Sequence, residues 1–599
     1  MATTSYSPDA QLTTGMIIRR VLFVALVLGL ALYHLFLNFR GLSHERGIDQ
    51  AQIAREVGRG NGFATKFIRP LSLKQVNSFR EEGAMENPEA SLWGFQDIYH
   101  APLNPLLNSV FLRAFKGKWT FEATNPEDDS VYFLDRVIAA VSMLMFFGAM
   151  GVTYLLVGRI FDGKIAGVTV LLMGLCSLMW DMTQSGLPQM LMLFLSSFAF
   201  YFLYRAVEAQ QEEALPTVWL ALAAGFLGLL ALSHWITVWI FVGVLIFSAV
   251  YFRPRGMMAV VLLGVFVVVV AAWGWRNYKV CGNIFGSGIF LLKTGLAEGS
   301  ESLIFRNFNP EAQPFDTAGL FSKLMLNSLI QINDLYTLLG AIVVAPLFFL
   351  SLLHPFKRRE IADFRWCILA MWIAAVIGMT VYGLPQKEMD SNQLHILFAP
   401  LMAAYGLAFL TVVWNRIGFE TMNPLVTQGH FIIVCIISAI PLLLPFPRNI
   451  RADLMRDKKF RANWPPYYPP SLALMSTFTD EKEVLVSDLP WAVAWYTDRP
   501  SLWLPRDVKQ FNDLRAYSAE RGTPFAGLLL TPVTLDGRIS SGIFDGEYAP
   551  WKEVIFYPQG VSLNLDTLRE IPTFPFTQST PVLGAQMYLF SDTPRWAER

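Results

Sequence analysis

About eleven long apolar segments constrain the fold of this chain more than any other feature of its sequence. They lie near residues 16–38, 133–157, 164–180, 189–206, 216–233, 235–252, 257–274, 335–353, 366–382, 395–413 and 429–446. A helix needs about 20 apolar residues to cross the hydrocarbon core of a bilayer, where backbone polar groups must all be paired. With 54% hydrophobic and 16% charged residues, the chain also has the balance of a membrane protein. The sequence predicts a polytopic α-helical membrane protein.

Lysine and arginine residues gather in alternate loops between these segments. They are Arg19, Arg20, Arg159, Lys164, Arg253, Arg255, Lys357, Arg358, Arg359 and Arg416. Short loops rich in these residues stay in the cytoplasm, so we expect a cytoplasmic N-terminus. Three large regions would then lie outside the cytoplasm: a first loop at about 39–132, a second at about 275–334, and the region 447–599.

A Pro-rich stretch at 465–470 follows the last apolar segment and separates a membrane domain, 1–446, from the polar region 447–599. In that region short apolar runs, typical of strands, alternate with amphipathic stretches. We expect strands at 483–486, 527–530, 553–556 and 587–590, and a helix at about 508–520. This pattern predicts a small extracytoplasmic α/β domain with a mainly parallel sheet.

The first large loop carries two short helical patterns. Asp49 and Gln52 have the spacing of a capping box, which predicts a helix that begins at Asp49 and ends near Gly58. Apolar residues recur at helical spacing from about Pro102 to Phe115. Amphipathic helices beside membrane spans lie in the interface with their apolar faces toward the lipid. The loop is therefore expected to form an ordered platform on the outer membrane surface.

Several function classes are disfavoured by what the sequence lacks. The formal net charge is zero, so no basic field points to nucleic acid. The four cysteines show no CxxC spacing, so neither a zinc site nor a disulfide framework is indicated. The sequence has no P-loop, no Asp-x-Asp pair, no GxSxG elbow and no HExxH motif. We expect no metal and no cofactor, which leaves the chemistry to carboxylates and cations near the outer membrane face.

The order of motifs in the membrane part resembles the GT-C superfamily of glycosyltransferases. One span is followed by an outer loop in which Asp49 opens a juxtamembrane helix that carries Ala54 and ends at Gly58. The run Asp97-Ile98-Tyr99-His100-Ala101-Pro102-Leu103 is similar to the acidic residue and His-Pro-Pro-Leu-like run of the family. The branch near the aminoarabinose transferases and protein O-mannosyltransferases begins in this way.

Later positions extend the resemblance and also mark where the chain departs from it. The run Trp273-Gly274-Trp275-Arg276-Asn277-Tyr278 is similar to an Arg-Asn pair that ends a central span in some members. His395 lies where a late span commonly opens with arginine, Gln50 replaces a frequent glutamate, and Ala101 replaces a proline. The resemblance covers the membrane part, up to about residue 446.

The resemblance implies an integral-membrane inverting glycosyltransferase, in a bacterial inner membrane, that moves a sugar from a polyprenyl-phosphate carrier to an acceptor outside the cytoplasm. Asp49 would act as the catalytic base or orient the acceptor. His100, Arg276, Lys279 and His395 would bind the substrate at its phosphate, because a cation at headgroup depth suits a phosphate whose tail stays in lipid.

Other interpretations of the same residues stay open. A helix cap explains Asp49 without chemistry, and Arg276 and Lys279 also fit interfacial anchors beside tryptophans. A transporter or flippase for the lipid carrier is disfavoured because the interiors of the spans are poor in charged residues. A non-catalytic membrane scaffold, with region 447–599 as its binding domain, would not depend on Asp49.

Overall fold

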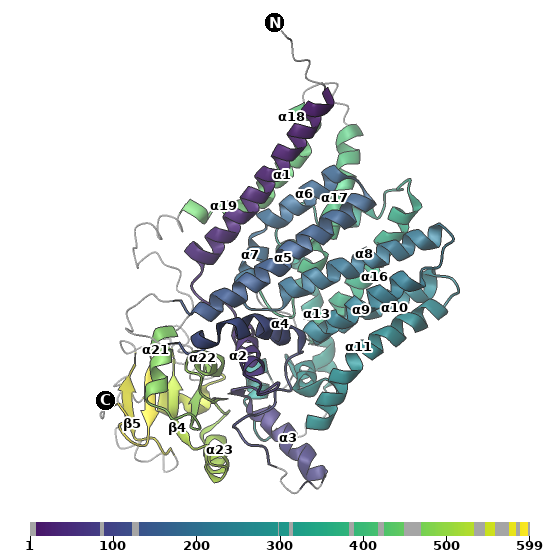
Figure 1. Ribbon diagram of the computed structural model, residues 1–599. Helices are drawn as coiled ribbons and strands as arrows, with labels where there is room; N and C mark the ends of the chain where they lie inside the picture. Colours follow the sequence, from purple (N-terminus) through teal and green to yellow (C-terminus); the bar gives the residue numbers. More distant parts are fainter. Residues whose placement is uncertain are drawn as a thin grey trace.

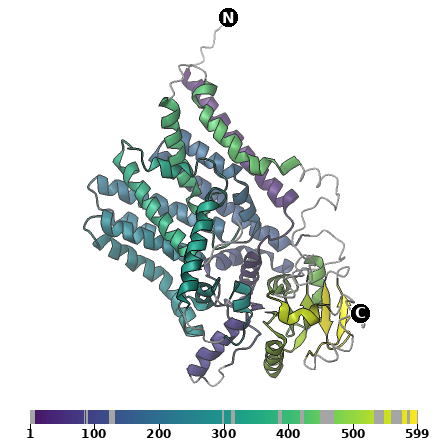
Figure 2. The ribbon, with the colours of Figure 1, turned by 180° about the vertical axis from the view of Figure 1, so that it is seen from behind.

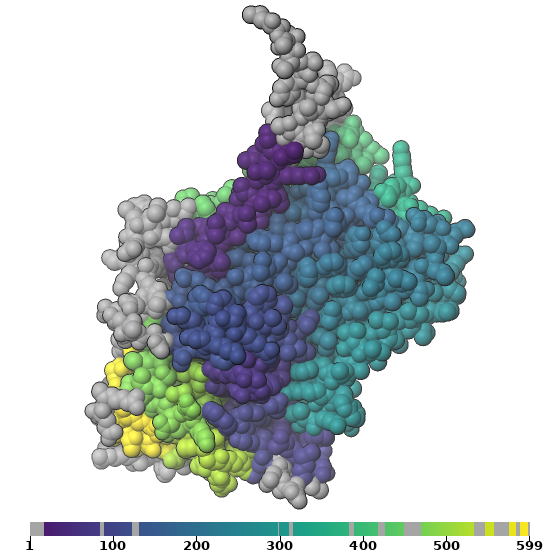
Figure 3. Space-filling view, in the orientation of Figure 1, coloured from purple at the N-terminus to yellow at the C-terminus, as the bar shows by residue number. Residues whose placement is uncertain are grey.

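Helices make up most of the structure, a computed structural model shown in Figure 1. It describes residues 8–83, 85, 89–121, 131–296, 299–310, 316–382, 389–416, 424–447, 469–531, 546–556, 574–582 and 587–596. A bundle of long helices occupies one part of the molecule, and a region with a β-sheet occupies another. The first loop lies between them, as the space-filling view also shows (Figure 3).

Among the described residues, six helices are long and apolar enough to cross a membrane. They lie at Ile17–Asn38, Phe133–Ile160 (α5), Gln189–Gln211 (α8), Met257–Cys281 (α11), Arg359–Tyr382 (α16) and His395–Arg416 (α17). The first of them combines most of α1 (Pro8–Leu32) with the π-helix η1 (Tyr33–Asn38). The chain is therefore an integral membrane protein.

Shorter or broken apolar helices complete the bundle. The pair α6 (Gly163–Leu175) and α7 (Ser177–Gln184) passes the same test as one span bent by 55°. The shorter elements are α9 (Thr217–Ser233), η3 (Trp235–Thr237) with α10 (Val238–Tyr251), α18 (Pro424–Thr427) and α19 (Gly429–Leu443). Most predicted segments thus coincide with apolar helices, and the total of about eleven spans stays a prediction.

The apolar segment at 335–353 does not form the single helix that the sequence predicted. It contains the short helices α14 (Leu335–Leu338) and α15 (Leu347–Ser351). Between them Gly340 and Ala341 have left-handed backbone angles, with φ of 75° and 56°, a conformation that ends a right-handed helix. An apolar composition alone therefore does not establish that the backbone is helical throughout a segment.

The membrane helices share one large apolar core. Helix α17 is buried along most of its length and packs against α6, α8 and α15, while α8 also contacts α5 and α9. Helices α1 and α19 run alongside each other at one edge of the bundle in both views (Figures 1 and 2). Many apolar side chains of α1 are exposed at this edge, as expected of a helix that faces lipid.

The first loop contains α2 (Glu45–Arg59), α3 (Pro70–Glu82), α4 (Leu103–Leu112) and the 3-10 helix η2 (Arg113–Lys118). Helix α2 begins after His44, whose imidazole Nδ1 accepts the backbone N–H of Arg46 at 3.2 Å. The prediction that Asp49 begins and caps this helix is wrong, because Asp49 lies in its second turn. The helix ends at Gly60, which has a φ of 92°.

Helix α2 is covered by protein and not by lipid. It packs against α4 and against α22 (Pro490–Tyr496) of the C-terminal region. The backbone of Ser185 and Gly186 lies so close to Gly47 that a Cβ atom there would overlap it. The prediction that the apolar face of α2 lies against lipid is therefore wrong, because this face contacts other parts of the same chain.

A six-stranded sheet in the described part of the chain joins the C-terminal region to the first loop. Its strand order is β1-β3-β2-β4-β6-β5. The strands are β1 (Phe67–Ile68), β2 (Val484–Ser487), β3 (Ser501–Trp503), β4 (Phe525–Leu530), β5 (Gln578–Pro581) and β6 (Tyr588–Ser591). Pairing is parallel from β1 to β4 and antiparallel from β4 through β6 to β5. Because β1 comes from the first loop, the sheet is not confined to residues 447–599.

The remaining C-terminal elements are α21 (Pro469–Leu474), η6 (Met475–Thr477), α22, α23 (Val508–Glu520), η8 (Ala549–Trp551) and α26 (Lys552–Phe556). Helix α23 coincides with the predicted helix. The strand predicted at 553–556 is wrong, because these residues belong to α26, in which Val554 and Ile555 are buried at a helical spacing from the buried Trp551 of η8. Residues 448–468, with most of the Pro-rich stretch, lie outside the described residues, and the domain division at 446 stays a prediction.

Candidate active site

Asp49 lies at the centre of a buried polar cluster in the first loop. Its side chain is on α2 and is 1% exposed. Oδ2 accepts hydrogen bonds from Arg69 Nη2 at 2.5 Å and from His100 Nε2 at 2.6 Å, and Oδ1 accepts one from Gln52 Nε2 at 3.1 Å. The Arg69 guanidinium is itself held between the rings of Phe67 and Tyr99, at 4.1 and 4.0 Å from their centroids. The Asp49 carboxylate is therefore fixed on both oxygens.

The surroundings of Asp49 keep it ionised. Burial alone would raise the pKa of this carboxyl, but the charge of Arg69 and the hydrogen bonds from Arg69 and His100 outweigh burial and hold the pKa below its usual range. An ionised carboxylate only accepts hydrogen bonds. His100 must therefore donate from Nε2 to Asp49, which leaves the lone pair of the neutral imidazole on Nδ1.

Asp97 fixes the backbone that carries His100. Its Oδ2 accepts the backbone N–H groups of Tyr99 at 3.2 Å and of His100 at 2.8 Å. Burial raises the pKa of the Asp97 carboxyl despite the opposing effect of His100, and the nearby Asp49 carboxylate adds to the rise. Asp97 thus holds the turn before α4 through hydrogen bonds to its backbone.

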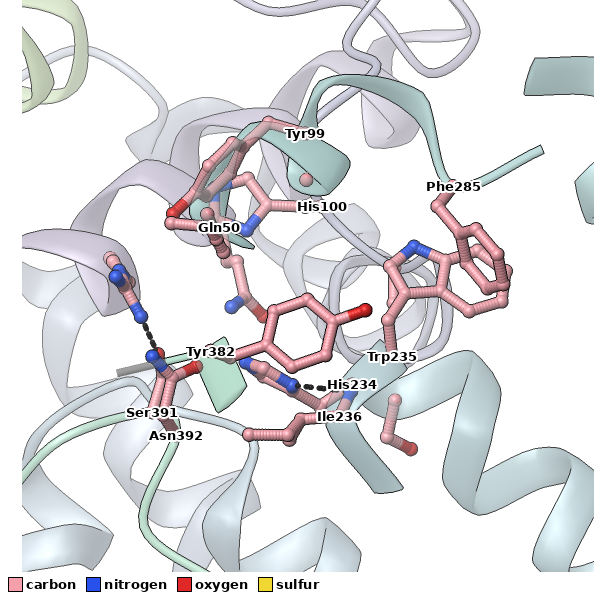
Figure 4. Close-up of a pocket in the computed structure, with 15 residues that line it drawn as sticks. Gln50, Tyr99, His100, His234, Trp235, Ile236, Phe285, Tyr382, Ser391 and Asn392 are labelled. Carbon is pink, nitrogen blue, oxygen red and sulfur yellow. Dashed lines mark hydrogen bonds between the residues drawn. The ribbon is translucent and has the colours of Figure 1, made fainter. Parts of the chain in front are cut away.

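His100 lies at the wall of a cavity of about 600 Å³, counting the part that is open to solvent (Figure 4). The lining residues are Arg46, Gln50, Tyr99, His100, Ala101, Ser233, His234, Trp235, Ile236, Phe285, Gly288, Leu291, Tyr382, Ser391 and Asn392. They come from the first loop, the turn between α9 and η3, the 3-10 helix η4 (Gly286–Lys293), the end of α16 and the approach to α17. Asp49 does not line the cavity; it is hydrogen-bonded to His100, which does.

Arg46 brings a positive charge to this wall, and the charge is already balanced. Its guanidinium donates to Glu301, in helix α12 (Glu301–Phe305), and to Ser391, and Asp390 lies 3.7 Å away. Tyr99 also donates its hydroxyl to Glu301 at 2.6 Å. Burial would lower the pKa of Arg46, but the charges of Glu301 and Asp390 raise it well above its usual range. Arg46 therefore stays charged and ties α2 to two later segments.

Three of the predicted substrate-binding residues have partners away from the cavity. Arg276, on α11, donates to the backbone carbonyl of Asp97 and, at 3.0 Å, to Gln96 Oε1, so it holds the turn that carries His100. Lys279 is exposed, with its Nζ 5.2 Å from the ring centroid of Trp275. Contacts of Arg276 and Lys279 with substrate stay predictions.

His395 is the third of these residues, and it is enclosed by protein. Its Nδ1 accepts from Trp372 Nε1 at 3.1 Å, and its Nε2 lies 3.1 Å from Gln331 Oε1. Gln331 belongs to α13 (Thr317–Asn333), which packs against α16. Both ring nitrogens thus serve helix packing, and a substrate contact of His395 stays a prediction. In the described part of the chain, no three His, Cys, Asp or Glu side chains are grouped as a metal site would need.

Sequence reasoning missed several residues that the structure brings to the cluster and the cavity. They are Arg46, Arg69, Trp235 and Ser391. Only Arg46 had a usable signal, since it precedes Asp49 by three positions and three-residue spacing places two side chains on one face of a helix. The others are distant in sequence from Asp49, and no local pattern connects them to it.

A second buried cluster joins α2 to the C-terminal region. Asp498, just after α22, accepts from Arg59 Nη2 at 2.6 Å and from Lys66 Nζ at 2.6 Å, and lies 3.1 Å from Arg55 Nη2. Burial would raise the pKa of the Asp498 carboxyl, but the neighbouring cations lower it far below its usual range. The position of α2, and with it that of Asp49, depends on a residue more than 400 positions away.

Acid should weaken this junction in a defined way. The pKa of Asp498 is lower in the folded state than in the unfolded state, so its contribution is present above about pH 4 and is lost as the pH falls below that. We expect the thermal stability of the detergent-solubilised protein to decrease between about pH 5 and pH 3. Asp498→Asn should be less stable at pH 7 and show a flatter decrease. An equal slope in both proteins would contradict the assignment.

Comparison with known proteins identifies the fold. No protein-family model matches the sequence, and no curated protein sequence is a significant match. ArnT from Cupriavidus metallidurans bound to undecaprenyl phosphate is structurally similar, with a TM-score of 0.53 at 13% identity, over 97% of this chain and 98% of that chain. ArnT in the apo state has a TM-score of 0.46 at 13% identity, over 88% of this chain and 95% of that chain.

A third structure, the oligosaccharyltransferase AglB from Archaeoglobus fulgidus in complex with an inhibitory peptide and a dolichol-phosphate, has a TM-score of 0.47 at 12% identity. The match covers 89% of this chain and 72% of that chain. At such identities a structural likeness establishes the fold only, and the first match, which spans nearly all of both chains, does so. The chain is an integral membrane protein with the GT-C fold that its sequence motifs resemble.

Proposed function

We propose that this protein is an inverting glycosyltransferase that moves a sugar from a polyprenyl-phosphate carrier to an acceptor outside the cytoplasm. The observation that carries the proposal is the pair of His100 and Asp49, an imidazole at a cavity wall held by a buried carboxylate. The structurally similar ArnT was solved with undecaprenyl phosphate bound. That ligand supports a donor of the same chemical class for this chain.

In the proposed reaction an acceptor hydroxyl attacks the anomeric carbon of the bound sugar. The new C–O bond forms while the bond between that carbon and the carrier phosphate breaks on the opposite face, so the configuration inverts. The hydroxyl proton passes to Nδ1 of His100, and the polyprenyl phosphate leaves with the bonding electron pair. A phosphate leaves as a stabilised anion, so one general base is sufficient.

Asp49 acts in this proposal by holding His100. The carboxylate keeps Nε2 protonated, orients the ring and stabilises the imidazolium that forms after proton transfer. Its own lowered pKa and its contacts with Arg69 and Gln52 make it a weak proton acceptor. The role that we propose for Asp49, positioning of His100, therefore differs from both roles that the resemblance implied, catalytic base and orientation of the acceptor.

The membrane arrangement follows from the charged loops. We propose a cytoplasmic N-terminus in a bacterial inner membrane, with residues 447–599 forming an extracytoplasmic α/β domain. The contacts of α2 with α22 support this placement, because they put the first loop and the C-terminal region on the same side of the bundle. The carrier would then enter the cavity from the outer leaflet, with its chain in the lipid.

Transfer from a labelled donor tests the proposal. Full-length protein in liposomes is given a polyprenyl-phosphate sugar labelled in the sugar, together with an envelope extract as the source of acceptor. We expect label to move from the lipid to the acceptor and free polyprenyl phosphate to accumulate. If the intact donor only moves to the other leaflet, the protein is a transporter. If every donor lipid tried stays unchanged in its original leaflet, the scaffold interpretation replaces the proposed function.

A further inference from the structure

One wall of the cavity consists of residues that the proposed reaction does not yet use. Ser233 ends α9, His234 follows it, and Trp235 and Ile236 begin η3; all four line the cavity. Figure 4 shows the imidazole of His234 and the indole of Trp235 at the edge of the open space, with the Tyr382 hydroxyl directed toward Trp235.

His234 presents an uncharged N–H group. Its Nδ1 accepts the backbone N–H of Ile236 at 3.3 Å, so the neutral ring carries its proton on Nε2. Burial, with a further effect from the charge of Arg46, lowers the pKa of His234 to about 3. The ring therefore stays neutral at physiological pH, and Nε2–H is a donor that no described residue accepts.

Trp235 adds a second donor of the same kind. Its indole Nε1 is buried and has no hydrogen-bond partner among the described residues. A buried donor without a partner destabilises a protein, and buried polar groups are nearly always paired. Because Trp235 lines the cavity and Trp273 does not, a ligand in the cavity can supply the acceptor that this donor lacks.

The helix that starts at this wall favours a negative charge. His234 is the residue before η3, which continues into α10, so the N-terminal end of a long helix faces the cavity. The dipole of a helix makes its N-terminal end attractive to anions. Helix dipole, indole and imidazole thus act on the same region of the cavity.

The cations near the cavity do not supply this anion site. Among the lining residues Arg46 is the only lysine or arginine, and Glu301 and Asp390 already balance its charge. Arg276, which the sequence suggested for this task, holds the turn at Asp97 instead. An anion at this wall must therefore be bound by neutral donors.

We propose that the wall formed by Ser233–Ile236 binds the phosphate group of the polyprenyl carrier through Nε2–H of His234 and Nε1–H of Trp235. This inference rests on the proposed function and adds to it the site of the leaving group. It places the phosphate across the cavity from His100, with the sugar between them, as displacement with inversion requires.

Equilibrium binding to the full-length protein in lipid nanodiscs tests the assignment. The probes are labelled undecaprenyl phosphate, undecaprenol with the same chain but no phosphate, and inorganic phosphate. We expect Trp235→Phe and His234→Ala each to weaken binding of undecaprenyl phosphate by about tenfold or more, as for loss of a hydrogen bond to a charged group. Binding of undecaprenol should be unchanged in both variants.

Trp273→Phe is the matched control, since Trp273 also has a buried indole N–H without a partner among the described residues but does not line the cavity. If a folded Trp235→Phe variant binds undecaprenyl phosphate as tightly as Trp273→Phe does, the assignment of the phosphate site is overturned. The proposed function would still stand in that case if the wild type transfers sugar. If the wild type binds undecaprenyl phosphate no better than undecaprenol, both fail. Equal affinity for inorganic phosphate would show that the carrier is not the ligand of this wall.

Discussion

His100→Ala is expected to lower the rate of sugar transfer by about 10²- to 10⁴-fold, the range typical for loss of a general base. The imidazole lies at the cavity wall, and in the proposed reaction its Nδ1 accepts the proton of the acceptor. Donor binding should change little, because the site proposed for the donor phosphate does not include His100. Initial rates at saturating donor, measured in liposomes, check the result.

A double variant that combines His100→Ala with Asp49→Asn shows whether His100 and Asp49 act as one unit. An asparagine at position 49 keeps the size of the side chain but can donate to Nε2, which would favour the wrong tautomer of His100. We expect Asp49→Asn to lose transfer to a similar extent and the double variant to be no slower than either single one. A multiplicative loss in the double variant would show that Asp49 has a role of its own as base.

A distant histidine provides the control for these variants. His354 lies in the loop before α16 and does not line the cavity, so His354→Ala should keep full transfer. If Asp49→Asn also kept full transfer in a normally folded protein, the role of the pair in the proposed reaction would be refuted.

Gly47→Ala should destabilise the protein and displace the active site. A Cβ atom at Gly47 would overlap the carbonyl oxygen of Ser185 and come within 2.9 Å of backbone carbons of Ser185 and Gly186. The backbone of Ser185 and Gly186 cannot move aside as a flexible side chain can, so α2 must shift. Overpacking of this kind costs about 1–3 kcal/mol, and more where the neighbours are rigid. Thermal unfolding in detergent and the rate of transfer measure the two effects.

Gly58→Ala is the matched control on the same helix. The nearest atom to a Cβ at Gly58 belongs to Trp119 at 3.6 Å, which is an ordinary contact. Alanine also loses less backbone entropy than glycine when a helix forms, so this variant should be stabilised by about 0.5–1 kcal/mol. If Gly47→Ala were as stable as Gly58→Ala, the close packing of α2 on the 185–186 backbone would not be what positions Asp49.

Local patterns predicted those elements whose formation depends on their own residues. Apolar segments found most of the membrane helices, and the spacing of Phe511, Leu514 and Tyr517 marked α23. Prediction failed at 335–353, where the left-handed backbone at Gly340 breaks the helix, and at 553–556, where burial against Trp551 favours a helix over a strand. In both cases an apolar run was compatible with more than one backbone conformation.

In the candidate site, too, the sequence predicted some residues correctly but not their partners. The motifs in the first loop selected Asp49 and His100, and the structure joins these two residues at 2.6 Å although 51 positions separate them. The motif at residues 273–278 predicted Arg276 as a phosphate ligand, whereas in the structure Arg276 donates to a backbone carbonyl of the loop that carries His100. A motif identifies candidate site residues, but it does not predict the hydrogen-bond partner of each one.

The sequence by itself determined that this chain crosses a membrane by helices and that its first loop holds a carboxylate and a histidine beside apolar helices. These properties follow from composition and periodicity, which act through solvation and local backbone preference. Only the tertiary structure decided that Asp49 is buried behind His100, that Arg46 is neutralised by Glu301 and Asp390, and that Asp498 holds α2. Those outcomes depend on charges brought together from distant parts of the chain, because burial makes each charge require a partner that no local pattern names.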